Sequence, residues 1–157
     1  MFGRKKAIKG YISSPVKGEA LSLEKVEDEA FSSKMLGDGI AVEPSSGDFV
    51  SPCDGTVASV AKTAHAYNII SNDGLEILVH IGIDTVELKG DGFEPKVAEG
   101  DKVKRGDPLC RADIELIKKK GYSTVTPIVI SNISELSFFD RHNGSVKEGD
   151  VLIDYVM

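Results

Sequence analysis

The sequence predicts an all-β protein, an antiparallel β-sandwich or barrel with two related halves and one or two short helices. Its 157 residues are 41% hydrophobic, which suits one domain with a real core. Aromatic residues make up only 6% and tryptophan is absent, whereas Gly, Val, Ile, Ser and Thr are plentiful. Turn-forming residues recur about every 8 to 12 positions, the spacing expected between strands of a sandwich or barrel.

Eight segments combine β-prone residues with flanking turn residues and are predicted to be strands. They are Glu19–Leu23, Ile40–Glu43, Thr56–Val60, Ala66–Ile70, Glu76–Ile81, Pro108–Arg111, Pro127–Ile130 and Val151–Val156. Because no linker interrupts them, residues 11–157 are expected to form a single domain.

Only two segments are predicted to be helical. Asp113 is a candidate N-cap, followed by Glu115 in the first turn, basic residues 118–120 in the last turn and Gly121 at the end. These charges and caps agree with the helix dipole. A looser helical turn is expected from Asp28 to Ser33.

Similar turn sequences recur along the chain. Residues 14–18, Ser-Pro-Val-Lys-Gly, match residues 51–55, Ser-Pro-Cys-Asp-Gly, and a Gly-Asp step recurs at 100–101, 106–107 and 149–150. Such repeats favour a fold built from two related β halves.

The formal net charge of -6 argues against nucleic acid as a partner and favours a basic protein surface. Cys53 and Cys110 stand in no C-x-x-C arrangement, so both are expected to be reduced and buried. No apolar run approaches the roughly 20 residues of a membrane span, and no secretory signal follows Met1. A cytoplasmic protein is therefore expected.

Residues 1–10 are expected to be a short basic tail. They contain four basic and two large apolar residues: Arg4, Lys5, Lys6, Lys9, Phe2 and Ile8. Chain ends are usually frayed and solvated, so a peripheral contact with an anionic membrane is the most that this pattern allows.

The stretch from Lys62 to Leu88 predicts a β-hairpin. Residues 72–74, Asn-Asp-Gly, tolerate positive φ and lie between two β-prone segments. With a two-residue loop at Asp73 and Gly74, Tyr67 lies opposite His80, and His65 is the diagonal neighbour on the same face. The hairpin is therefore expected to bring two imidazoles together.

Strand alternation gives His80 an outward direction. Four β-branched residues are expected to face the core: Ile77, Val79, Ile81 and Ile83. The other face carries Leu78, His80 and Gly82, and the small glycine is expected to leave room beside the His80 ring. In this register the same outward face of the partner strand carries His65, Tyr67 and Ile69.

An imidazole pair can carry a phosphoryl group. A ring with a reference pKa of about 6.5 is largely neutral and nucleophilic at pH 7. Phosphoryl transfer needs in-line access and neutralisation of the equatorial oxygens. His65 is expected to donate to those oxygens, Thr63 to fix its tautomer, and Asp84 to hold a partner's arginine or orient the site.

Residues 74–86, Gly-Leu-Glu-Ile-Leu-Val-His-Ile-Gly-Ile-Asp-Thr-Val, closely resemble the active-site signature of glucose-type enzyme IIA of the bacterial phosphoenolpyruvate-dependent sugar phosphotransferase system. Supporting segments are Lys34–Ala41, Thr63–Ala66, Glu87–Phe93 and Thr126–Asn132. The resemblance covers roughly Pro15 to the C-terminus and implies an antiparallel β-sandwich or barrel.

The resemblance implies a phosphotransferase component. By this resemblance His80 is expected to accept phosphoryl from the histidine-containing phosphocarrier protein HPr and to pass it to a cysteine of the IIB domain of a sugar permease. His65 matches the histidine that supports the phosphoryl group, and Thr63 matches the threonine that orients it. The expected partner-binding residues are Asp38, Asp84, Leu78 and Gly82. Regulatory docking to other proteins is also implied.

Two other functions remain open from the residues alone. His80 and Asp84 have the H-x-x-x-D spacing of some zinc hydrolases, but a catalytic zinc needs three protein ligands, and the third histidine, His142, lies in a predicted turn. No cofactor is required, although His65 and His80 could together hold zinc. The second alternative is a purely regulatory module without phosphoryl flux. Both a free-standing protein and a domain of a larger permease fit the sequence.

Overall fold

The structure, a computed structural model, describes residues 7–157 as fourteen strands, two short α-helices and three 3-10 turns. The strands are β1 (Lys9–Ser13), β2 (Gly18–Ser22), β3 (Asp38–Pro44), β4 (Asp48–Val50), β5 (Gly55–Val60), β6 (Ala66–Ser71), β7 (Glu76–His80), β8 (Phe93–Pro95), β9 (Lys102–Val103), β10 (Pro108–Ala112), β11 (Thr126–Ile130), β12 (Phe138–Arg141), β13 (Gly144–Val146) and β14 (Val151–Val156). The helices are α1 (Glu29–Ser32) and α2 (Ile114–Lys119), and the 3-10 turns span Leu23–Lys25, Thr85–Leu88 and Ile133–Glu135.

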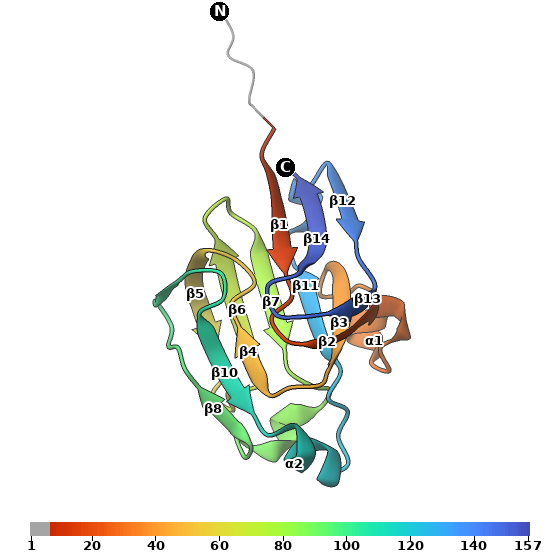
Figure 1. Cartoon of the computed structure of the whole chain (residues 1–157), viewed down its shortest axis with the longest axis vertical. Helices are drawn as coiled ribbons and strands as arrows, with labels where there is room; N and C mark the ends of the chain where they lie inside the picture. The colour runs from red at the N-terminus through yellow and green to blue at the C-terminus, as the bar shows by residue number, and fades with distance from the viewer. Residues whose placement is uncertain (1–6) are drawn as a thin grey trace, which may run out of the picture.

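The strands form three antiparallel sheets (Figure 1). The largest has the order β13-β2-β3-β11-β7-β6-β5-β9, and the two smaller ones have the orders β4-β10-β8 and β1-β14-β12. Buried residues from all three sheets, among them Ile12, Phe49 and Ile77, belong to one main core. The predicted all-β antiparallel fold is confirmed.

The eight predicted strands are all present, each ending within two residues of its predicted bounds. Six further strands were not predicted: β1, β4, β8, β9, β12 and β13. Five of these six have four residues or fewer, too few to display an alternating pattern.

Both predicted helical segments are confirmed, and their caps are the expected ones. The Asp113 carboxylate accepts a hydrogen bond from Leu116 N at 3.1 Å, and Gly121 follows the helix with φ +90°. At the start of α1 the Asp28 carboxylate accepts from Ala30 N at 2.9 Å. Local capping chemistry therefore determines where both helices begin.

The structure shortens the predicted basic tail. Lys9 and Gly10 lie in β1, opposite Val156 and Tyr155 of β14, so they belong to a sheet. The predicted tail residues 1–6 lie outside the described residues. Within residues 7–157 the structure contains no helix with the length and apolar character that crossing a membrane requires.

Two of the recurring turn sequences share one geometry. Gly106 and Gly149 both have φ +91°, and the aspartate that follows each glycine accepts a hydrogen bond at 2.8 Å from the backbone N–H three residues earlier. The Asp107 carbonyl then accepts from Ser51 N at 2.8 Å, and the Asp150 carbonyl accepts from Ser14 N at 2.7 Å.

The two Ser-Pro segments are also alike. The hydroxyl of Ser14 and that of Ser51 each donate to the carbonyl two residues later, both at 2.7 Å. The repeated sequences therefore form matching local turns, as a fold with two related β halves predicts, although the turn at Gly100 and Asp101 has the same geometry too.

A smaller apolar cluster lies apart from the main core. Its buried members are Leu23, Val26, Phe31, Ala41, Ile83 and Val129. Ala41 and Val129 alternate along their strands with residues of the main core, so this cluster occupies the other face of the large sheet. Segment 23–32 therefore covers the outer face of the sheet beside β7.

Both cysteines are free and buried, as predicted. Ile77, Val79 and Ile81 belong to the main core, which also agrees with the prediction. Ile83 does not, because Gly82 has φ +77° and interrupts the alternation of the strand.

Candidate active site: two facing histidines

The predicted β6–β7 hairpin is present, but its loop is one residue longer than predicted. Ser71 N donates to Leu75 O at 2.9 Å, so Asn72, Asp73 and Gly74 form a three-residue loop. Gly74 has φ +96°, a conformation typical of the last residue in such loops. The predicted two-residue loop is wrong.

The longer loop changes the register by one residue. Ala66 lies opposite His80, and Tyr67 lies opposite Val79. A one-residue change moves side chains to the other face of a sheet, and Tyr67 and Ile69 are accordingly buried in the main core. The expectation that these two residues share the outward face of His80 is therefore wrong.

The two imidazoles nevertheless meet. The ring centroids of His65 and His80 lie 4.9 Å apart, with an angle of 83° between the ring planes. His65 precedes β6 and follows Ala64, which has φ +58°. The turn at Ala64, rather than strand alternation, sets the direction of His65.

A carbonyl group orients His80. His80 Nδ1 and the Gly82 carbonyl oxygen are 2.7 Å apart, and a carbonyl can only accept, so Nδ1 carries the proton and Nε2 keeps its lone pair. A Cβ on Gly82 would lie 2.5 Å from Thr85 Cγ2 and 2.7 Å from Ser123 O. Glycine at position 82 therefore allows the backbone conformation that brings its carbonyl to His80 Nδ1. The sequence predicts only that this small residue leaves space beside the His80 ring.

A hydroxyl group orients His65. Thr63 Oγ1 lies 2.6 Å from His65 Nδ1, which brings together the two residues that the sequence paired. With the hydroxyl as donor, Nδ1 accepts and the proton of the neutral ring is on Nε2. The two rings then differ in tautomer.

Both rings are neutral near pH 7. Burial and, to a smaller extent, charge repulsion from the nearby His80 together lower the pKa of His65 to about 4. Burial also lowers the pKa of His80, while the Gly82 carbonyl, Asp28 and Asp84 act in the opposite direction. A neutral His80 with a free Nε2 is a nucleophile without a dedicated base.

The acidic residues of the site differ in part from those predicted. Asp84 is exposed, has φ +59°, and its charge raises the pKa of His80, while its expected contact with a partner's arginine stays a prediction. Asp38 instead accepts from Arg141 Nη2 at 2.6 Å and lies 3.7 Å from Lys34 Nζ, with 16% of its side chain exposed. The structure corrects its placement: Asp38 is an internal ion-pair partner, and Asp28 is the second carboxylate whose charge acts on His80.

Aromatic and apolar side chains surround the pair. Phe31 of α1 lies 5.1 Å from the His80 ring, and Phe93 of β8 lies 6.4 Å from the His65 ring. Leu78 packs half-buried against the smaller apolar cluster. Large exposed apolar residues follow α1 and Asp84: Met35, Leu36 and Val86. This face is therefore partly apolar and carries negative charge.

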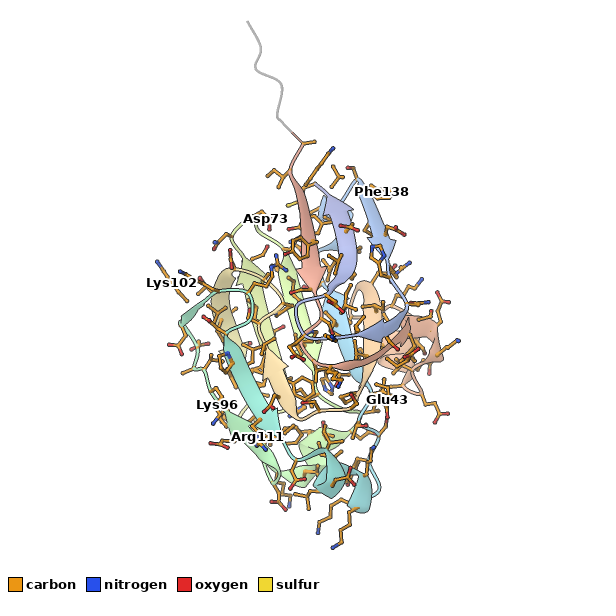
Figure 2. The ribbon with its side chains drawn as sticks, in the orientation of Figure 1. Glu43, Asp73, Lys96, Lys102, Arg111 and Phe138 are labelled. Carbon is orange, nitrogen blue, oxygen red and sulfur yellow. The ribbon has the colours of Figure 1, made fainter. Side chains whose placement is uncertain are left out.

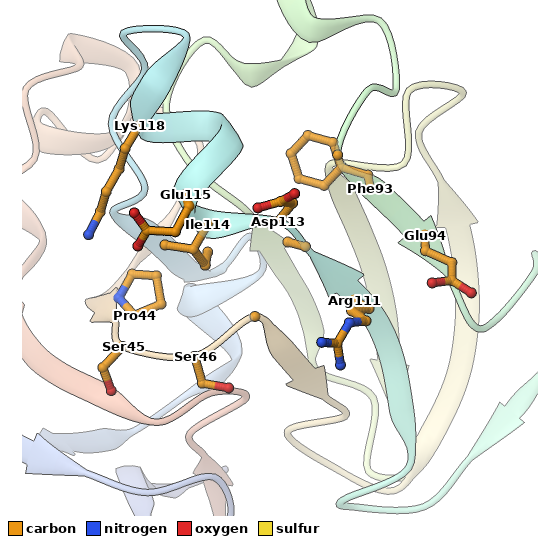
Figure 3. A pocket seen from close by; sticks show the side chains of 13 residues that line it. Pro44, Ser45, Ser46, Phe93, Glu94, Arg111, Asp113, Ile114, Glu115 and Lys118 are labelled. Atoms are coloured by element: carbon orange, nitrogen blue, oxygen red, sulfur yellow. The ribbon is translucent and has the colours of Figure 1, made fainter.

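A separate groove is lined in part by Phe93 (Figure 3). It has a volume of about 660 Å³ and runs between α2, the Pro44–Gly47 turn and strands β8 and β10. Its charged lining residues have both signs, including Arg111 and Glu115. Neither imidazole lines it, so the groove and the histidine pair are distinct features.

Among residues 7–157, no three His, Cys, Asp or Glu side chains are arranged to hold a metal ion. His142 bonds to Asp154 Oδ2 at 2.7 Å, so it does not complete a site with the pair. A zinc ion held by His65 and His80 would have two protein ligands, and this zinc site stays a prediction.

The fold and the site define an antiparallel β-sandwich that carries two neutral, facing imidazoles. The family model of the phosphoenolpyruvate-dependent sugar phosphotransferase system, EIIA 1, matches residues 10–136. The chain belongs to this family of phosphotransferase components, which confirms the resemblance to glucose-type enzyme IIA.

Known relatives include both short and long proteins. The chain is 43% identical over 142 residues to the PTS system glucose-specific EIIA component of Buchnera aphidicola, and the match covers 90% of this chain and 88% of that protein. It is 48% identical over 143 residues to the PTS system beta-glucoside-specific EIIBCA component of Bacillus subtilis, covering 90% of this chain but 24% of that protein. The structure of glucose permease IIA from Mycoplasma capricolum matches with a TM-score of 0.86 and 38% identity, covering 98% of this chain and 99% of the other.

Proposed function

We propose that this protein is a phosphoryl carrier. His80 accepts a phosphoryl group from HPr and passes it to a cysteine of the IIB domain of a sugar permease. The observation that carries the proposal is the His80 ring itself, whose Nδ1 donates to the Gly82 carbonyl at 2.7 Å, so that Nε2 keeps its lone pair, and whose centroid lies 4.9 Å from that of the His65 ring. Nε2 is then the nucleophile.

A single nitrogen, Nε2 of His80, both receives and releases the phosphoryl group. The Nε2 lone pair forms a bond to phosphorus as the bond from phosphorus to the donor imidazole breaks, and the donor ring keeps that electron pair. In the second step a cysteine thiolate of IIB attacks phosphorus, and the pair returns to Nε2. The Nδ1 proton stays on His80 throughout, held by the Gly82 carbonyl.

His65 supports the group on His80. When Thr63 donates to Nδ1, the Nε2 hydrogen of His65 is free to donate to a phosphoryl oxygen. The low pKa of His65 keeps this ring neutral, so its donor role is constant between about pH 6 and pH 8.

The face around His80 suits basic partners with an apolar contact area. Asp28 and Asp84 provide negative charge, and Phe31 and Val86 provide apolar surface. The name of the Bacillus subtilis relative places IIB and IIC parts in one protein with its EIIA part, which supports a IIB partner here. The relatives are named for different sugars, so the sugar is not assigned. Regulatory docking on the same face and a cytoplasmic location accompany the proposal.

Phosphorylation tests the assignment of His80. Purified protein is incubated with labelled phosphoenolpyruvate, the first enzyme of the system and HPr, and acid-labile phosphate is measured. Wild type and His142→Ala are expected to label, because His142 bonds to Asp154 outside the pair. His80→Ala is expected to stay unlabelled. Normal labelling of His80→Ala, or no label on wild type, contradicts the proposal.

Replacement of His65 separates acceptance from donation. His65→Gln replaces the imidazole by an amide that can still donate but with a different geometry, so the protein is expected to accept phosphoryl and to donate it at least about tenfold more slowly. Single-turnover transfer to purified IIB domain measures the second step. Equal donation rates for the variant and wild type would remove His65 from the mechanism.

Charge removal at Asp28 and Asp84 tests partner attraction. Asp28→Asn keeps an oxygen for the Ala30 N–H cap, so it removes charge without removing the cap. Each change to Asn is expected to slow phosphorylation by HPr several-fold at low salt, and less at high salt. Asp48→Asn, at an exposed ion pair with Arg111, is the control. A salt-independent effect, or none, argues against attraction.

A further inference from the structure

The direction of His65 does not follow from the strand that it precedes. Ala66 lies opposite His80, and Ile81 N donates to the His65 carbonyl at 2.7 Å, so pairing continues to His65. Neighbouring residues of a strand face opposite sides of the sheet, so His65 and Ala66 would face opposite sides. His65 would therefore point away from His80 if the strand were regular, yet the ring centroids are 4.9 Å apart.

A closed turn redirects the chain at this point. Ala64 N donates to Ala61 O at 2.7 Å, and Ala61 N donates to Ala66 O at 2.9 Å. Ala64 within this turn has φ +58°, which an alanine adopts only when its surroundings hold it there. What holds Ala64 therefore also determines where His65 points.

Two buried donors converge on the carbonyl oxygen of Ala64. The Tyr67 hydroxyl donates to it at 2.8 Å, and Cys110 Sγ lies 3.8 Å from it. This oxygen belongs to the peptide bond that joins Ala64 to His65. Tyr67 is completely buried, and burial raises its pKa, so its hydroxyl keeps its proton and remains a donor.

We propose that Tyr67 is a positioning residue for phosphoryl transfer, whose hydroxyl, assisted by the Cys110 thiol, holds the peptide bond before His65 so that the His65 ring faces His80. This inference rests on the proposed phosphoryl carriage. It assigns a part in the chemistry to a core side chain that touches neither the phosphoryl group nor a partner.

The chain offers a matched pair of variants. Tyr67→Phe removes the hydroxyl bond to Ala64 and keeps the ring in the core. Tyr155→Phe also removes a well-buried hydroxyl, but this hydroxyl bonds to Asp73 in the loop at the other end of the hairpin. Both variants lose one hydrogen bond, and only the first is expected to affect His65.

Imidazole ¹⁵N spectra report the position of His65 directly. In Tyr67→Phe the His65 nitrogen signals are expected to move toward those of a ring that has lost its bond to Thr63, and in Tyr155→Phe to remain where they are in wild type. Unchanged His65 signals in Tyr67→Phe overturn the inference. If Tyr67→Phe does not fold, Cys110→Ala replaces it and is expected to move the same signals by a smaller amount, and unchanged signals again overturn it.

Transfer rates link the spectrum to the reaction. Tyr67→Phe is expected to donate phosphoryl to IIB about threefold to tenfold more slowly than wild type, and Tyr155→Phe at the wild-type rate. Equal rates for Tyr67→Phe and wild type overturn the inference while the carrier function stands. If wild type itself takes no phosphoryl group, the carrier function fails, and the spectra still decide whether Tyr67 positions His65.

Discussion

At the scale of single residues, two chemically identical side chains have different protonation patterns because their partners differ. The Gly82 carbonyl can only accept and so keeps a proton on His80 Nδ1. The Thr63 hydroxyl can donate as well as accept, and when it donates, the proton of His65 is on Nε2. One ring then offers a lone pair and the other a hydrogen bond at the same site.

The low pKa of His65 makes stability depend on pH. Between pH 6.5 and about 4 the unfolded chain binds a proton at His65 and the folded protein does not, so the free energy of unfolding decreases as pH falls through this range. The full loss from this ring is on the order of 3 kcal/mol. About 2 kcal/mol of this is expected to be lost between pH 7 and pH 5, and urea unfolding at these two pH values measures that part.

His65→Gln provides the comparison, because glutamine does not titrate. The variant is expected to lose less stability than wild type between pH 7 and pH 5. Burial also lowers the pKa of His80, so this second ring accounts for part of the stability that the variant still loses. Equal losses in both proteins would show that His65 keeps its ordinary pKa in the folded state.

At the scale of elements, the end of β7 depends on one backbone conformation. Gly82 has φ +77°, and a Cβ there would meet Thr85 and the Ser123 carbonyl. Gly82→Ala is expected to destabilise the protein by about 3 kcal/mol, because strain and overlap add. Denaturant unfolding measures the loss, and labelling of His80 is expected to fall because the carbonyl moves.

Gly74→Ala separates strain from overlap. Gly74 has φ +96°, but no atom lies within 4 Å of the position that a Cβ would take. This variant is expected to cost only about 1 kcal/mol. Equal losses at Gly74 and Gly82 would mean that the contacts of Gly82 contribute nothing.

The β6–β7 hairpin marks the limit of prediction from sequence. Alternation from Ile77 to Ile81 correctly placed His80 outside the core, because β7 is regular and one of its faces is buried. The register was wrong by one residue, since Asn72, Asp73 and Gly74 suit both two-residue and three-residue loops. The left-handed Ala64 has no sequence signal, so the reason why His65 meets His80 could be found only in the structure.

The acidic residues show a second limit. Asp28 was recognised as part of a helical turn, and its cap is local chemistry that a sequence displays. Its nearness to His80 depends on α1 covering the outer face of the large sheet, a contact between segments far apart in the sequence. The family resemblance points to Asp38, but a resemblance in sequence does not reveal that Arg141 pairs with it.

At the scale of the whole molecule, the two related halves predict equal responses to equivalent changes. Asp107 and Asp150 each accept a backbone N–H at 2.8 Å in matching turns. Asp107→Ala and Asp150→Ala are each expected to destabilise the protein by about 1 kcal/mol, measured by thermal or denaturant unfolding.

Asp140→Ala, at an exposed position of β12, is the control and is expected to stay within about 0.5 kcal/mol of wild type. A difference of more than about 1 kcal/mol between Asp107→Ala and Asp150→Ala would show that the two halves are no longer energetically alike, although their turns keep the same geometry.

The pairing of β1 with β14 has a consequence for how the domain can be joined to others. Lys9 lies opposite Val156, so both ends of the described chain emerge at one end of the molecule (Figure 1). The hairpin loop with Asp73 lies toward this end (Figure 2) and bonds to Tyr155 of β14, while His80 is the last residue of β7, at the end of the strand away from this loop. A neighbouring domain attached at either terminus would start from the end away from the histidine pair, so its linker would have to span the length of the β6–β7 hairpin before a tethered module could reach the imidazoles.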